Sequence, residues 1–167
     1  TDCIIWAVAN GKKIVPSRPQ DCSIQTSDII SLIKDYGTDV IAPENHRLKI
    51  PLSEVGEVMV MGSTGLLKGM QTALKRDLLE YFSTDVEFTG TVGSPMQCMM
   101  KGVCGQCLQW QIDPQSGERT RAVFSCSMQD QPLMWIDLDN LAARQSQTRL
   151  QEHLTAKWVD YVLTKDT

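Results

Sequence analysis

The sequence contains no apolar run approaching the roughly 20 residues that a membrane-spanning helix requires. It also shows no secretory signal. A basic excess is absent, because 16 Lys and Arg stand against 20 Asp and Glu, for a formal net charge of −4. Proteins that bind nucleic acid usually carry a clustered positive charge. We therefore expect a cytoplasmic protein with no membrane span and no nucleic-acid partner.

Histidine is scarce. His46 and His153 are the only two, and neither belongs to a pattern with a Ser or Cys nucleophile. We therefore identify no candidate catalytic side chain. The 167 residues suffice for one domain, or one domain with a small appendage. Because Thr1 is not an initiator Met, we expect the chain to be processed or cut from a longer protein.

The first half of the chain predicts an α/β fold. Nearly continuous apolar runs are typical of strands buried on both faces of a parallel sheet, and apolar residues spaced three and four apart predict helices. In chain order, the sequence predicts a strand over 3–9, a helix over 27–36, a strand over 58–61, a helix over 66–82 and a strand over 85–89. This alternation indicates a layered α/β unit.

Cysteine, in contrast, is plentiful, with six residues. Without an export signal, thiols and metal sites are more probable than disulfides. Cys98, Cys104 and Cys107 lie in one Gly- and Met-rich loop over 94–109, and Cys126 follows at a distance. The spacing is similar to the C-x₄-C-x₂-C…C pattern of plant-type [2Fe–2S] ferredoxins, except that the first gap holds five residues.

A hairpin is predicted after the cysteine loop. Its strands cover 109–112 and 120–124, and the connection over 113–118 contains Pro and Gly, which suit a turn. This pairing would return Cys126 to the side of the loop, as a shared set of four ligands requires. A helical tail is predicted over 139–163. Its apolar residues Leu141, Ala142, Leu150, Leu154, Trp158 and Tyr161 or Val162 are expected to face the core.

Other interpretations of the cysteines stay open at this point. A structural zinc site usually has two C-x₂₋₄-C knuckles, and only Cys104 and Cys107 form one. A thioredoxin-type C-x-x-C dithiol should lie at the start of a helix that follows a strand. It would also leave Cys98 and Cys126 unexplained. All four could also be unrelated core thiols, as we expect for Cys3 and Cys22.

Two stretches carry a resemblance to a known family. They are V-M-V-M-G-S-T-G-L-L-K-G-M at 58–70 and P-M-Q-C-M-M-K-G-V-C-G-Q-C-L-Q at 95–109, the second followed by F-S-C at 124–126. The chain resembles the C-terminal part of the electron-transfer subunit of dihydroorotate dehydrogenase B, within the ferredoxin–NADP reductase superfamily. The resemblance covers residues 55–126, and the longer tail is typical of a larger FAD- and NAD(P)-dependent oxidoreductase.

The resemblance implies a fold, a cofactor and a set of ligands. It implies a partial Rossmann-like NAD(P)-binding lobe, with a parallel sheet and helices, over 1–92. A [2Fe–2S] domain with a β-hairpin would follow over 93–135, and a C-terminal helical extension over 136–167. It further implies that one iron is held by Cys98 and Cys104 and the other by Cys107 and Cys126. Gly62, Ser63 and Thr64 would form an edge of the nicotinamide site, although a glycine turn between a strand and a helix is common and could be only a tight turn.

The same resemblance implies partners, and it shows which parts of the family are absent from this sequence. FAD and NAD(P) would be cofactors of the full-length protein, with a flavin domain in the same or a companion chain and a redox partner protein or subunit. The flavin-binding barrel and the Gly-rich phosphate loop of the family are not in this sequence, and Met61 replaces a frequent cysteine. We therefore expect an electron-transfer segment that is not catalytically competent alone. The alternative is a zinc- or iron-stabilised interaction module without redox activity.

Overall fold

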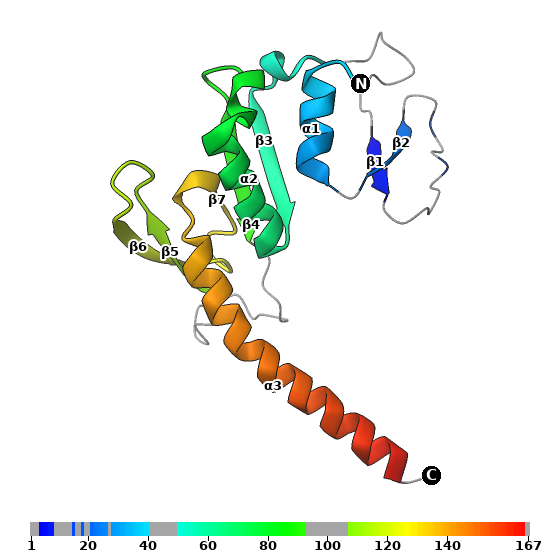
Figure 1. The fold of residues 1–167 in the computed structure, drawn as a ribbon. Helices are drawn as coiled ribbons and strands as arrows, with labels where there is room; N and C mark the ends of the chain where they lie inside the picture. The colour runs from blue at the N-terminus through cyan, green and yellow to red at the C-terminus, as the bar shows by residue number, and fades with distance from the viewer. Residues whose placement is uncertain are drawn as a thin grey trace. The chain divides into compact units, whose positions relative to one another are not determined.

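The chain is a mixed α/β protein, and its described residues form three small sheets. The computed structural model describes residues 4–8, 15, 18, 21–26, 28–40, 50–92 and 107–165 (Figure 1). These residues belong to two compact units, one formed by residues 1–58 and 69–87 and the other by residues 59–68 and 88–167. The α/β class predicted from the sequence is therefore confirmed.

The first unit contains a parallel two-stranded sheet. Strand β1 (Ile5–Val8) pairs with strand β2 (Cys22–Gln25), and Ile5 lies opposite Cys22. The predicted strand over 3–9 is thus confirmed in β1, whereas β2 was not predicted. Ahead of β2, the Asp21 carboxylate accepts hydrogen bonds from Arg18 Nε and from the backbone N–H of Ile4, both at 2.9 Å. The Arg18 bond, followed by the Ile4 bond, lowers the pKa of Asp21 below its ordinary value of 3.8.

Helix α1 (Ile29–Gly37) confirms the helix predicted over 27–36. Its N-cap is Asp28, whose side chain accepts hydrogen bonds from Ser31 Oγ at 2.6 Å and from the backbone N–H of Ile30 at 3.0 Å. These two bonds lower the pKa of Asp28 below 3.8, because both favour the ionised carboxylate. A cap of this kind satisfies N–H groups that the first helical turn leaves without partners.

The segment after residue 56 alternates strand, helix and strand, as predicted, but its details differ. Strand β3 (Glu57–Gly62) is not buried on both faces: Val60 is buried, whereas Met59 is 54% exposed and Met61 67% exposed. Helix α2 (Thr64–Arg76) ends six residues before the predicted end. Asp77 leaves the helical conformation with φ of −148°, and a short 3₁₀ turn (Leu78–Tyr81) follows.

The three-stranded sheet has the order β3-β4-β7. Strand β4 (Glu87–Val92) pairs antiparallel with β7 (Asp130–Pro132), so that Gly90 lies opposite Gln131. The short strand β7 was not predicted. A Cβ atom on Gly90 would lie 2.9 Å from Leu133 Cδ1 and 3.0 Å from Ile136 Cδ1, so this position has no room for a larger residue.

The predicted hairpin is confirmed. Strands β5 (Leu108–Ile112) and β6 (Arg119–Phe124) pair antiparallel, with Leu108 opposite Phe124. In the turn, the Gly117 N–H donates to the Asp113 carbonyl at 2.8 Å, and Gly117 has φ of +73°. Glycine is suited to this left-handed conformation because it has no Cβ.

Helix α3 (Leu138–Lys165) confirms the predicted helical tail but not its predicted burial. Leu141 is buried, as expected, whereas Leu150, Leu154 and Trp158 are 66%, 58% and 65% exposed. The described residues Tyr161 and Val162 are also exposed. Among the side chains of this helix that the structure describes, those that are buried therefore lie near its start. Among the helices that the structure describes, none combines the length and hydropathy of a membrane span.

Candidate functional site

Cys107 and Cys126 lie at the same end of the hairpin. Cys107 immediately precedes β5, and Cys126 follows the end of β6 by two residues. Between them, the backbone N–H and the hydroxyl of Ser125 both donate to the Cys107 carbonyl, at 3.2 and 3.3 Å. The strand ladder thus extends to Cys107 and to Ser125, the residue before Cys126. Cys107 is buried and Cys126 is partly exposed.

The other two predicted ligands, Cys98 and Cys104, lie outside the described residues. Within the ranges that the structure covers, no group of three or more His, Cys, Asp or Glu side chains could hold a metal ion. The four-cysteine site therefore stays a prediction. Of the pairing that it requires, the structure describes the contact between Cys107 and Ser125, the residue before Cys126.

Two further contacts hold this end of the hairpin. The chain after β6 turns tightly, because the N–H groups of Ser127 and Met128 both donate to the Phe124 carbonyl, at 3.0 and 2.9 Å. On the other strand, the guanidinium of Arg144 from α3 donates to the carbonyl of Leu108. A cation is thereby placed beside the residue that follows Cys107, where it would favour negative charge.

The buried face of β5 is polar. Burial alternates along the strand, so that Gln109 and Gln111 are buried while their neighbours are half-buried. The amide of Gln111 is fully used: Nε2 donates to Gln131 Oε1 at 2.9 Å, and Oε1 accepts from Arg121 Nε at 2.7 Å. Gln131 in turn donates to the Met128 carbonyl at 3.1 Å. This network ties β5 to the connection between β6 and β7.

Gln109 differs from its neighbour. Its exposed fraction is 0%, and neither its Nε2 nor its Oε1 has a hydrogen-bond partner in the part of the chain that the structure describes. Buried amide groups without partners are costly and uncommon in native proteins. From the sequence, Gln109 is predicted to lie in a strand and is assigned no role. The repeat of Cys and Gln at positions 107, 109 and 111 was the available signal, because alternate strand residues share a face.

The predicted nicotinamide segment lies at the junction of β3 and α2. Gly62 ends β3, and Thr64 begins α2. Ser63 lies between them and caps the helix: its hydroxyl accepts from the backbone N–H of Leu66 at 3.2 Å, and its carbonyl accepts from Leu67 at 3.1 Å. A short polar turn thus presents the N-terminal end of α2, where the helix dipole favours negative charge.

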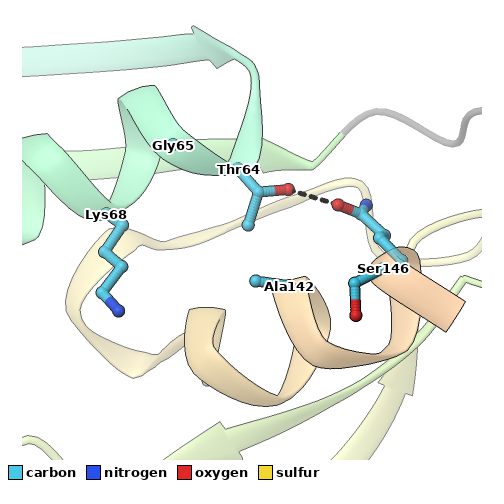
Figure 2. Close-up of a pocket in the computed structure, with 6 residues that line it drawn as sticks. Thr64, Gly65, Lys68, Ala142 and Ser146 are labelled. Atoms are coloured by element: carbon cyan, nitrogen blue, oxygen red, sulfur yellow. Dashed lines mark hydrogen bonds between the residues drawn. The ribbon is translucent and has the colours of Figure 1, made fainter. Parts of the chain in front are cut away.

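A pocket of about 260 Å³ adjoins this turn (Figure 2). It is lined by Thr64, Gly65 and Lys68 of α2 and by Ala142, Gln145 and Ser146 of α3. The Thr64 hydroxyl donates to Gln145 Oε1 at 2.7 Å, and Lys68 forms an ion pair with Asp139. The volume lies just below the range of about 300–1,000 Å³ that holds drug-sized ligands, so the pocket suits one small polar group.

The α3 half of this pocket was not predicted. Thr64 and Gln145 are 81 residues apart in the sequence, and no local pattern in the tail indicates that it faces α2. Of the three predicted residues, Thr64 lines the pocket. Gly62 and Ser63 form the turn that precedes it.

Comparison with known proteins gives a relative without a described activity. No protein-family model matches the chain. Over 136 residues, or 81% of the chain, the sequence is 30% identical to an uncharacterized protein of Rickettsia prowazekii (strain Madrid E). The chain spans 18% of the length of that protein. This relative therefore shows no activity, substrate or partner for the chain.

Proposed function

We propose that the chain is the electron-transfer segment of a flavin-dependent NAD(P)H oxidoreductase. Four thiolates, from Cys98, Cys104, Cys107 and Cys126, would hold a [2Fe–2S] cluster. The observation that carries this proposal is the hydrogen-bonded ladder between Cys107 and Ser125, the residue next to Cys126. It supports the proposal because ligands far apart in the sequence must be brought to one place before they can share a metal centre.

The surroundings of Cys107 fit an anionic centre. A [2Fe–2S] cluster with four thiolate ligands carries net negative charge, and hydrogen bonds and nearby cations stabilise it. Arg144 reaches the carbonyl of Leu108, and the buried amide of Gln109 lies two residues from Cys107 with no partner among the described residues. Burial of Cys107 would also limit solvent access to the iron. These features support a redox cluster more than an ordinary buried thiol.

Bound at these thiolates, a [2Fe–2S] cluster would supply one-electron transfer. The two electrons that a hydride carries from NAD(P)H to flavin could then leave the flavin one at a time. The chain's own residues would position that group and shield it from water. None of them needs to donate or accept a proton. The flavin would come from a domain in the same or a companion chain, and the electrons would pass to a separate redox protein in the cytoplasm.

The part of the chain over 1–92 would be the remainder of a Rossmann-like NAD(P)-binding lobe. The parallel pairing of β1 with β2 and the succession β3, α2, β4 support this assignment. The pocket at Thr64 supports an edge of the nicotinamide site at Gly62, Ser63 and Thr64, because it offers a small cavity at a helix N-terminus. Its size suits one ring of the dinucleotide and not the whole cofactor.

Anaerobic reconstitution of the chain with iron and sulfide tests the proposal. We expect two irons and two sulfides per chain, visible absorption bands, and a rhombic paramagnetic resonance signal of a reduced [2Fe–2S] centre after dithionite. A chain that stays colourless and binds zinc tightly would instead support the metal-stabilised interaction module. Iron that binds without acid-labile sulfide and without a reducible signal would also contradict the redox role.

A further inference from the structure

The unused amide of Gln109 is the strongest unexplained feature of the described residues. Both of its polar atoms are buried and without partners, although the surrounding polar side chains are hydrogen-bonded. Each unsatisfied buried group costs free energy, so a native protein that keeps one usually has a reason, such as a bound water, an ion or a functional role. A group that hydrogen-bonds to this amide should lie on the side of the strand that Gln109 faces.

Strand geometry identifies that side. Residues two apart in a strand project to the same face, with Cα atoms about 7 Å apart. Cys107 continues the β5 ladder through its bonds with Ser125, and Cys107 and Gln109 are buried to a similar extent, 5% and 0% exposed. Gln109 and the Cys107 thiol therefore share the buried face of the hairpin. A glutamine side chain, with three rotatable bonds, can reach a group bound to the neighbouring sulfur.

Gln111 shows that the orphaned amide is not a general property of this face. It is the next residue on the same side and forms hydrogen bonds with Gln131 and Arg121. The difference between the two glutamines is their distance from Cys107. Gln109, at the open end of the hairpin, is the nearer of the two to Cys107, a predicted ligand.

We propose that the Gln109 side-chain amide donates a hydrogen bond to a sulfur of the cluster held at Cys107 and so raises its reduction potential. This inference rests on the proposed function. Gln109 would be a positioning and tuning residue, not a ligand. The reduced cluster carries one more negative charge than the oxidised cluster, so a donor to its sulfur stabilises the reduced state more.

The Gln109→Met variant removes the amide and keeps the length of the side chain. We expect the variant to bind as much iron and sulfide as the wild type. At a fixed poise near the midpoint, its ratio of reduced to oxidised cluster should fall about tenfold, which is a shift of about 59 mV to more negative potential for a one-electron couple. Because Gln109 loses no protein partner, the metal-free variant should unfold at no lower a denaturant concentration than the wild type.

The matched control is Gln129→Met, which makes the same exchange at an exposed glutamine between β6 and β7. It should leave the potential unchanged. Potentials are measured by redox titration followed by absorbance and paramagnetic resonance.

The other possible results would each contradict the proposed role of Gln109 or the proposed function. An unchanged potential in a loaded Gln109→Met variant would overturn the inference and assign the amide to a buried water. Loss of iron from a folded variant would also overturn it, because the assigned role is tuning and not retention. If Gln109→Met fails to fold, Gln109→Leu takes its place, and failure of both would show a structural role instead. A wild-type chain that takes up no cluster would contradict the proposed function itself, so the two failures are distinguishable.

Discussion

The backbone N–H of Ser125 donates to the carbonyl oxygen of Cys107 at 3.2 Å, and the Ser125 hydroxyl donates to the same oxygen at 3.3 Å. This double contact extends the β5–β6 ladder beyond its last paired strand residues, Leu108 and Phe124. The spacing of Cys107 and Cys126 therefore depends on hairpin register. A one-residue slip would turn the side chains of one strand to the opposite face and break the contact between Cys107 and Ser125.

Replacement of either hairpin cysteine tests the ligand assignment. We expect Cys107→Ser and Cys126→Ser each to lose the visible absorbance of the two-iron centre after anaerobic reconstitution, because a serine hydroxyl is a poor substitute for a thiolate ligand. Cys22→Ser, in strand β2, should retain it and is the control. Full retention of absorbance by Cys107→Ser would contradict the assignment.

The turn of the hairpin depends on Gly117. Because its φ is +73°, we expect Gly117→Ala to lower the free energy of unfolding by about 1–2 kcal/mol. The control is Gly56→Ala, since a Cβ there meets no atom within 4 Å. Chemical denaturation of both metal-free variants measures the effect. Equal stability of the two would show that the turn tolerates a side chain.

Gly90 is constrained by packing instead. An added Cβ would lie 2.9 Å from Leu133 Cδ1, and both Leu133 and Ile136 are fully buried with little freedom to move. We expect Gly90→Ala to lower the free energy of unfolding by about 1–3 kcal/mol, as overpacked core substitutions do. Thermal unfolding followed by circular dichroism provides the measurement. A variant as stable as the wild type would mean that the β4–β7 region can shift to admit a methyl group.

The Asp28 cap gives a prediction about pH. Asp28→Ala should lower the free energy of unfolding by about 1 kcal/mol at neutral pH, because α1 loses its capping acceptor. Since the folded state lowers the pKa of Asp28, the stabilisation is present above the ordinary pKa of 3.8 and is lost as the pH falls through the folded value. Urea unfolding at pH 7 and at successive pH values below 4 should therefore show the difference between wild type and variant shrinking.

The matched control for that series is Asp35→Ala, in the same helix. Asp35 is half-buried and is not the N-cap, so this variant should not lose the capping contribution at neutral pH. A difference between wild type and Asp28→Ala that stays constant down to the most acidic pH would contradict the role of the carboxylate.

Local patterns predicted the elements well. The turn sequence between Ile112 and Arg119, with Pro and Gly, was sufficient to predict the hairpin, because both residues restrict the backbone in known ways. The helical spacing in α1 and α2 was equally informative, with Leu67, Met70 and Leu74 buried as predicted. The apolar spacing in α3 predicted the helix but not its burial. Leu150 is exposed because packing depends on which elements lie beside a helix, and a periodic pattern does not contain that information.

The candidate site was predicted only in part, for a related reason. Cys107 and Cys126 are joined by a hairpin that local sequence indicates. The orphaned amide of Gln109 and the contact between Thr64 and Gln145 depend instead on tertiary packing. Strand β2 was overlooked because it has four residues and pairs with a strand 17 residues earlier, a contact that no nearby turn predicts.

The hairpin closes a short loop, between residues fewer than 20 apart, so it can form early and at low entropic cost. For the proposed centre, this means that the strands that carry two of the four thiols are already paired before any iron arrives. If oxidation destroyed the iron and sulfide of the cluster, the hairpin that carries Cys107 and Cys126 would then stay folded. Repair would require redelivery of iron and sulfide to a folded protein, and not resynthesis of the chain.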